Sequence, residues 1–181
     1  MSEPAALPTR RACLAAALRL GAGLPGLPLA AGLQLSHAAT PGDTAPALAL
    51  LTTAGEAVLP GTGLPRWRAL YLDFWASWCG PCRQSFPWMN QLHDQHQAAG
   101  LRVVGINLDA RPEDAQDFLK QLPPRFAIAF DAAAASARDF GVKAMPSSFL
   151  IAPDRRVLLA HRGFRNEQRA ELERRIVAAL S

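Results

Sequence analysis

The stretch FWASWCGPCRQSFPW contains two cysteines, Cys79 and Cys82, with Gly80 and Pro81 between them. It lies where an apolar run gives way to a helical pattern, and Cys13 is the only other cysteine of the chain. Two thiols at this spacing could form a structural disulfide, bind a metal ion or exchange electrons with another disulfide. The surrounding residues favour one of these three chemistries.

A structural role for the pair is the weakest of the three. A disulfide stabilises a fold more when it closes a long loop than when it joins near neighbours. A metal site typically needs about four ligands, whereas this pair offers two, and no second Cys/His pair follows at zinc-finger spacing. His93 and His96 lie in a helical segment, where we interpret them as helix-surface residues, and His161 has no identifiable partner. The pattern therefore favours redox chemistry and predicts no metal site.

The expected position of the two thiols supports this chemistry. Cys79 follows a predicted buried strand, and Cys82 falls in the first turn of the predicted helix after it. Pro81 suits that turn because its missing N–H is not needed there. The partial positive charge at a helix N-terminus favours a thiolate, and Cys-X-X-Cys thiols commonly have a pKa of about 7 rather than about 8.5. We therefore expect Cys79 to attack a substrate disulfide and Cys82 to displace the reduced substrate.

The elements that must position the pair follow from hydrophobic periodicity and from turn residues. Two apolar runs, 69–76 and 102–109, are typical of buried parallel strands, and the segment 81–100 between them carries the apolar stripe of a helix. The other predicted elements are a hairpin at 47–60, a helix at 111–122, a strand at 126–131, a short helix at 132–142, a hairpin at 147–163 and a helix at 165–181. This order predicts an α/β fold with a mixed central sheet flanked by helices.

Residues 1–38 have the composition of an export signal, with a basic start, an Ala/Leu/Gly-rich middle and small residues before position 39. We expect cleavage after Ala38, loss of Cys13, a flexible lead-in at 39–46 and one domain at 47–181. Thr-Arg-Arg at 9–11 partly matches a twin-arginine signal, so the Sec and twin-arginine routes both stay open. An uncleaved anchor is the alternative, but the apolar run is shorter than the roughly 20 residues of a spanning helix.

The charge of the chain gives no reason to propose nucleic acid as a partner. The formal net charge is +4, and the arginines are dispersed along the sequence rather than gathered in one basic segment. A nucleic-acid-binding protein usually concentrates its basic residues on one face or along one helix. We therefore expect no nucleic-acid partner, and separately we expect the chain to act as a monomer.

The sequence LYLDFWASWCGPC, together with Met145-Pro146 ahead of a hairpin and a last helix, resembles the thioredoxin fold. The export signal, the N-terminal hairpin and the extra helix and strand resemble its TlpA-like branch of periplasmic thiol-disulfide oxidoreductases. The resemblance implies that Cys79 is the attacking thiol, that Cys82 is the resolving thiol and that Pro146 is a cis-proline facing the disulfide. The substrate contacts that it implies are Trp78, Gly80, Pro81, Met145 and Pro146.

Asp73 lies in the middle of the first apolar strand, between Leu72 and Phe74. It could be a carboxylate at the solvated end of that strand. The resemblance instead matches it to the buried aspartate behind the cysteine pair, which exchanges a proton with the resolving thiol. Burial would raise the pKa of such a carboxyl group. The lysine that accompanies this aspartate in thioredoxins has no match, because Gly105 stands there.

The resemblance implies an exported disulfide reductase for protein thiol substrates. No bound cofactor is needed, because the electrons travel as the Cys79/Cys82 dithiol, and a membrane electron donor is implied to re-reduce the pair. Cytochrome c maturation is one possible setting. An oxidant or isomerase on the same fold is the first alternative. The second is a copper metallochaperone that holds Cu(I) between the thiols with the help of Met145.

Overall fold

The computed structural model describes residues 38–59 and 67–181. The predicted export signal at 1–38 and Cys13 therefore lie outside the described residues, apart from Ala38. Within the described part of the chain, no helix is long and apolar enough to cross a membrane. No group of three or more His, Cys, Asp or Glu side chains in that part could hold a metal ion.

The centre of the fold is a five-stranded sheet in the order β5-β4-β3-β6-β7. β3 pairs in parallel with β4, and β4 in parallel with β5, whereas β6 runs antiparallel to both β3 and β7. The predicted mixed α/β fold is therefore confirmed. The strands are β3 (Ala69–Trp75), β4 (Leu101–Asn107), β5 (Ala127–Phe130), β6 (Ser147–Ile151) and β7 (Val157–Arg162).

β3 is the middle strand, and all seven of its residues are buried. Successive side chains of a strand point to opposite faces of the sheet. Tyr71 and Trp75 accordingly enter one hydrophobic cluster, and Leu72 and Phe74 enter another. An apolar run without polar alternation is what a strand covered on both faces requires. The same parity places Asp73 on the face of Tyr71 and Trp75.

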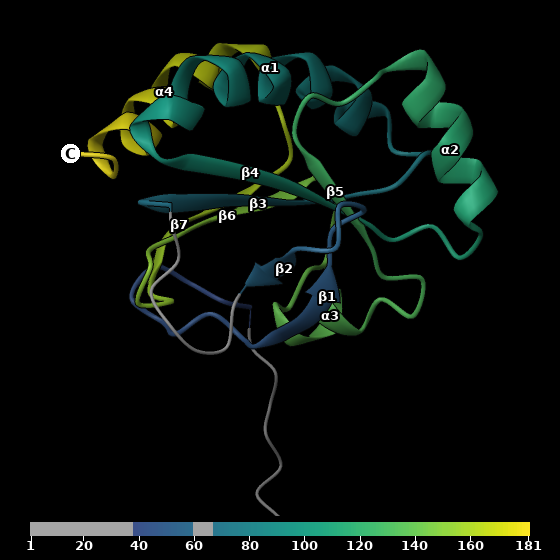
Figure 1. The fold of residues 1–181 in the computed structure, drawn as a ribbon, viewed down its shortest axis with the longest axis horizontal. Coiled ribbons are helices and arrows are strands. Elements are labelled where there is room, and N and C mark those ends of the chain that lie inside the picture. The colour runs from purple at the N-terminus through teal and green to yellow at the C-terminus, as the bar shows by residue number, and fades with distance from the viewer. Residues whose placement is uncertain (1–37, 60–66) are drawn as a thin grey trace, which may run out of the picture. The chain divides into compact units, whose positions relative to one another are not determined.

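Helices α1 (Gly80–His96) and α4 (Arg169–Ala178) lie together on one face of the sheet, with α2 (Pro112–Gln121) beside them (Figure 1). The hairpin of β1 (Leu48–Leu51) and β2 (Ala57–Leu59) and the short α3 (Ala135–Asp139) lie on the other face (Figure 1). Two 3₁₀ turns, η1 (Gln97–Ala99) and η2 (Asn166–Gln168), complete the helical segments. The sheet is thus covered on both sides, as its sequence predicts.

Aromatic rings fix α1 and α2 over the sheet. The ring centroids of Trp75 and Phe86 are 4.8 Å apart, and the Phe118 centroid is 4.8 Å from each of them. Phe126 adds a further contact with Phe86 at 5.2 Å. Such edge-to-face and tilted pairs add to the hydrophobic gain of burying the rings. The helix that carries the cysteine pair is therefore held rigidly against the central strand.

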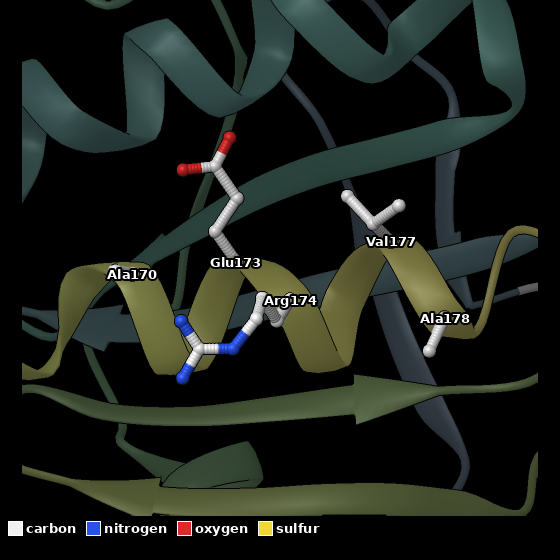
Figure 2. A pocket seen from close by; sticks show the side chains of 5 residues that line it. All are labelled: Ala170, Glu173, Arg174, Val177 and Ala178. Atoms are coloured by element: carbon white, nitrogen blue, oxygen red, sulfur yellow. The ribbon is translucent and has the colours of Figure 1, made fainter.

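Helix α4 is joined to α1 by polar contacts on the outer side of the pair. His96 Nε2 and Glu173 Oε1 are 3.0 Å apart, and Arg169 donates to the Gln91 side chain at 2.6 Å. Figure 2 shows Glu173 pointing away from α4 toward the neighbouring helix, while Arg174 points to the other side. The two residues, with Ala170, Val177 and Ala178, line a surface hollow of about 530 Å³. His96 is thus partly buried, with 19% of its side chain exposed, at the contact between the two helices.

Two boundaries differ from the sequence predictions. The short helix predicted at 132–142 is only five residues long, because Asp131 accepts hydrogen bonds from Ser136 and holds the preceding residues in a turn. The lead-in at 39–46, predicted to be flexible, is tied down. The backbone N–H groups of Ala39, Gly42 and Ala45 donate to Phe140, Val157 and Arg155. These backbone partners lie far along the chain and leave no local signal in the sequence.

Candidate active site

Cys79 and Cys82 form a disulfide with an S–S distance of 2.03 Å. Cys79 is the N-cap residue of α1, and its sulfur accepts a hydrogen bond from the Cys82 backbone N–H at 3.2 Å. Cys79 retains 4% exposure whereas Cys82 has none. Of the two cysteines, only Cys79 therefore keeps any contact with solvent, and it is also the one that caps the positive end of the helix.

The turn that leads into the cysteine pair is held by a carboxylate from the loop that follows β4. Asp109, 5% exposed, accepts from the Ser77 backbone N–H at 2.9 Å and from the Ser77 hydroxyl at 3.0 Å. The Asn107 side-chain amide donates to the same carboxylate at 2.7 Å. Because the carboxyl ends of the parallel strands β3 and β4 meet at one edge, Asp109 can hold the turn that places Cys79.

The Met145–Pro146 peptide bond is cis, as the resemblance implied. The Pro146 carbonyl accepts from the Gly163 N–H at 2.8 Å, and the Ser147 hydroxyl donates to the Ala144 carbonyl at 2.7 Å. These bonds tie the loop before β6 to the end of β7. Met145 packs against the hydrophobic cluster that contains both cysteines. The loop and the disulfide therefore belong to one packed unit.

An open groove of about 450 Å³ lies beside this unit. Trp78 forms one side of it and is 73% exposed, and Met145 contributes from the cis-proline loop. Gly80 and Pro81 are exposed at the start of α1. The predicted contact residues Trp78 and Met145 are thus brought together at one groove. The rest of its lining is apolar apart from two cations: Leu108, Ala134, Ala137, Arg138, Val142, Lys143 and Ala144.

Asp73 is fully enclosed, with 1% exposure, which rules out a solvated strand end. The Ser148 hydroxyl donates to Asp73 Oδ1 at 2.6 Å, while Oδ2 has no hydrogen-bond partner. Burial raises the pKa of Asp73 to about 7, and the bond from Ser148 works in the opposite direction. Burial and the nearby Asp73 also raise the pKa of Tyr71 above its ordinary value. The carboxyl group can therefore gain or lose a proton near neutral pH.

Gly105 is the register partner of Asp73 on β4. A Cβ atom at Gly105 would lie 3.0 Å from Trp75 Nε1 and 3.2 Å from a ring carbon of Phe126. These contacts are too close for a side chain without movement of the rings. The space that a lysine would need beside Asp73 is thus filled by aromatic rings, and Asp73 has no lysine at this position.

A comparison with protein-family profiles matches residues 40–176 to the Redoxin family. The chain belongs to the Redoxin family. Its thioredoxin-like fold is confirmed by a Chlorobium tepidum crystal structure, provisionally assigned as the thiol:disulfide interchange protein DsbE. That structure has 48% sequence identity and a TM-score of 0.71, and the match covers 78% of this chain and 98% of the other.

The Redoxin-family chain is also similar to curated proteins named thiol-disulfide oxidoreductase ResA. The protein from Bacillus thuringiensis subsp. konkukian is 29% identical over 104 residues, which cover 58% of this chain and 60% of the relative. The protein from Bacillus subtilis is 27% identical over 121 residues, covering 65% and 64%. The chain therefore spans less than two thirds of the length of these curated relatives.

One residue of this Redoxin-family site escaped the sequence prediction. Asp109 follows an apolar strand, as many surface carboxylates do, and nothing in the sequence separates it from them. The signal that could have found it is positional, because it ends the strand parallel to the one that precedes the cysteines. Asp73, in contrast, stood out because burying an unpaired charge inside an apolar strand costs a large amount of free energy.

We expect Asp109→Ala to destabilise the protein by about 1–3 kcal/mol, since the partly buried Ser77 N–H loses its acceptor. Urea unfolding of the oxidised protein measures this difference. Asp117→Ala is the matched control, because Asp117 is 71% exposed and pairs only with Lys120 on the surface of α2. Equal stabilities of the two variants would show that Asp109 does not hold the turn.

We expect Asp73→Asn to be more stable than the wild type, and increasingly so as pH rises. The folded wild type keeps the Asp73 proton up to about pH 7, whereas the unfolded chain releases it near pH 4. The folded state therefore binds more protons in this window, and wild-type stability falls as pH rises through it.

The asparagine variant lacks this loss, so its advantage should grow between about pH 4 and 7 and then level off, at no more than about 4 kcal/mol. Urea unfolding across this pH range tests the prediction, with Asp117→Asn as the control. A stability difference that stays constant with pH would contradict it.

Proposed function

We propose that this protein is an exported thiol-disulfide oxidoreductase that reduces disulfides in other proteins. The observation that carries the proposal is the Cys79–Cys82 disulfide at the first turn of α1, in which Cys79 keeps 4% exposure and Cys82 has none. Membership of the Redoxin family and the printed names of the ResA relatives support it. The buried carboxyl group of Asp73, on the sheet face that α1 covers, supplies the acid-base chemistry that such an exchange needs.

The proposed reaction begins with the reduced protein. The Cys79 thiolate attacks one sulfur of a client disulfide and releases the other client sulfur as a thiolate, which leaves a mixed disulfide. Cys82 then gives its proton to Asp73 and attacks the Cys79 sulfur, and the second client thiolate leaves. Two electrons pass to the client, whose thiolates take up protons from solvent. The buried position of Cys82 fits a resolving thiol that meets only Cys79.

The groove beside the disulfide supports a protein client in an extended conformation. Trp78 and Met145 both line it, Trp78 from the turn before α1 and Met145 from the loop before β6. An apolar client side chain next to the cysteine would bury surface against them, at roughly 25 cal/mol per Å² of apolar area. Gly80 and Pro81, exposed beside Cys79, leave room for the client backbone, and the Pro146 loop would lie along it.

The cellular setting is part of the proposal. An exported protein would start near Ala39, act as a monomer and need no bound cofactor, because the disulfide itself carries the electrons. A membrane electron donor would return it to the dithiol form. The signal-like composition of residues 1–38 supports export. Three client classes fit the proposal equally: apocytochromes, as in cytochrome c maturation, a copper-site partner protein, and misoxidised proteins in general.

The direction of electron flow follows from the surroundings of the thiolate. A strongly stabilised thiolate makes an oxidant, and a mildly stabilised one makes a reductant. Gly80 and Pro81 bring no positive side chain to Cys79. Arg83, in the first turn of α1, lies over the Phe118 ring at 4.8 Å and bonds to Gln121, so its charge is held by α2. We infer a reductase on these grounds.

We expect a reduction potential near the thioredoxin value of about −270 mV rather than the roughly −120 mV of a strong oxidant. Equilibration of the protein with glutathione buffers of known ratio measures the potential. A value above about −170 mV, closer to that of protein disulfide isomerase, would make the protein an oxidant or isomerase.

We expect Cys79→Ser to abolish insulin reduction and Cys82→Ser to accumulate mixed disulfides with clients, because only Cys82 can release them. The assay uses metal-free protein, so turnover also separates the enzyme from a copper metallochaperone. Ser85→Ala, which changes a buried hydroxyl one turn further along α1, is the control. If Cys82→Ser traps no mixed disulfide and both cysteine variants lose insulin reduction equally, the assignment of Cys79 as attacking thiol and Cys82 as resolving thiol is wrong.

A further inference from the structure

His161 is a titratable residue that has no role in the proposed reaction, although strand register aligns it with Asp73. It stands on β7 opposite Ser148 of β6, and Ser148 stands opposite Asp73 of β3. Residues that are register partners on neighbouring strands point to the same face of a sheet. Asp73, Ser148 and His161 therefore form one polar row across three strands.

The face on which this row lies is fixed by the row next to it. Tyr71, Leu150 and Leu159 are register partners of one another, and all three enter the hydrophobic cluster covered by α1 and α4. The polar row is two residues further along each strand, so its side chains point to the same face. That face is also the one against which Cys82 is buried.

Hydrogen bonds join only part of the row. The Ser148 hydroxyl donates to Asp73 Oδ1 at 2.6 Å, and Ser148 is 2% exposed. The other carboxyl oxygen of Asp73 and the Nε2 atom of His161 are both buried without a hydrogen-bond partner. In the oxidised protein the row is thus joined between Asp73 and Ser148 and open between Ser148 and His161. Orphaned buried polar atoms are rare in native structures and call for a reason.

We propose that the row Asp73–Ser148–His161 is the path by which the buried carboxyl group exchanges its proton with solvent at the β7 side of the sheet. It rests on the proposed function, in which Asp73 exchanges a proton with Cys82. Asp73 is only 1% exposed and Cys82 is fully buried, so neither can exchange protons freely with solvent, whereas His161 is partly exposed. The path supplies that missing connection.

The proton balance of the path is simple. A solvent proton binds the imidazole of His161, the imidazole passes one proton to the Ser148 oxygen, and the Ser148 hydroxyl passes its own proton to the Asp73 carboxylate. Ser148 is neutral before and after, and the imidazole returns to its neutral form. Cross-strand partners have Cβ atoms about 4.5–5.5 Å apart, so a turn of the imidazole or of the hydroxyl joins the open step. The reverse sequence releases the proton.

The charged and titratable groups around the row support this direction. Burial and Arg175, which faces His161 from α4, lower the pKa of His161, while a hydrogen bond with the Gly163 backbone opposes them. Burial raises the pKa of Asp73, and Tyr71 is the other ionisable group against it. The carboxylate therefore holds a proton more tightly than the imidazole does. A proton that arrives at His161 moves inward when Asp73 is ionised, and the proton that Asp73 takes from Cys82 leaves by the reverse sequence.

Carbon NMR of the Asp73 carboxyl group in the oxidised protein tests the path without any need for activity. The line width at the titration midpoint reports how fast the proton exchanges. We expect Ser148→Val to slow this exchange at least about tenfold. Ser148→Thr should preserve it, because threonine has the shape of valine but keeps the hydroxyl group. We expect His161→Ala to slow it similarly and added imidazole to restore it.

His93→Ala is the matched control, because His93 is also partly exposed with a buried, unpartnered ring nitrogen, but lies on α1 outside the row. Wild-type line widths in Ser148→Val and His161→Ala, or equal slowing in His93→Ala, would overturn the path. Resolution of the mixed disulfide should slow in the same two variants. A wild type that reduces no disulfide would remove the proposed function, and the NMR result would still decide the path.

Discussion

The site depends on the turn where β3 ends and α1 begins. Where the chain leaves a strand that is buried on both faces, the backbone N–H and C=O groups of the turn need hydrogen-bond partners. The Asp109 carboxylate supplies one for Ser77, and Cys79 itself caps the helix that follows. The rings of Trp75 and Phe86 hold the helix over the strand. The sulfur atoms are therefore placed by the strand, the turn and the core together.

The strands and helices that carry the site could be predicted from the sequence, because each has a strong local pattern. The apolar run of β3, interrupted only at Asp73, and the Gly-Pro between the cysteines are enough to predict a buried strand and a helix start. Asp109 and the tied lead-in at 39–46 could not be predicted in this way. Their partners lie far along the chain, so their roles exist only once the strands meet.

The burial and the hydrogen-bond partner of Asp73 depend on more than the strand in which it lies. Its position in an apolar run marked it as unusual, but burial depends on the helices that cover the sheet. Its partner Ser148 lies 75 residues away, and only the register of β3 with β6 brings the two together. The rings that fill the space over Gly105 are equally non-local. The acid-base properties of the site are thus set by strand register rather than by any motif.

The pairing of the N-terminal segment has a consequence for the behaviour of the protein in solution. The outer strands of the sheet would otherwise offer free backbone groups to another chain, which is a common route to aggregation. Gly42 and Asp43 bond with Val157 at the start of β7, and Thr53 bonds with Ile128 on β5. Both edges are partly covered by the same stretch of chain. Cleavage after Ala38 would leave these covers in place and keep the protein protected from edge-to-edge association.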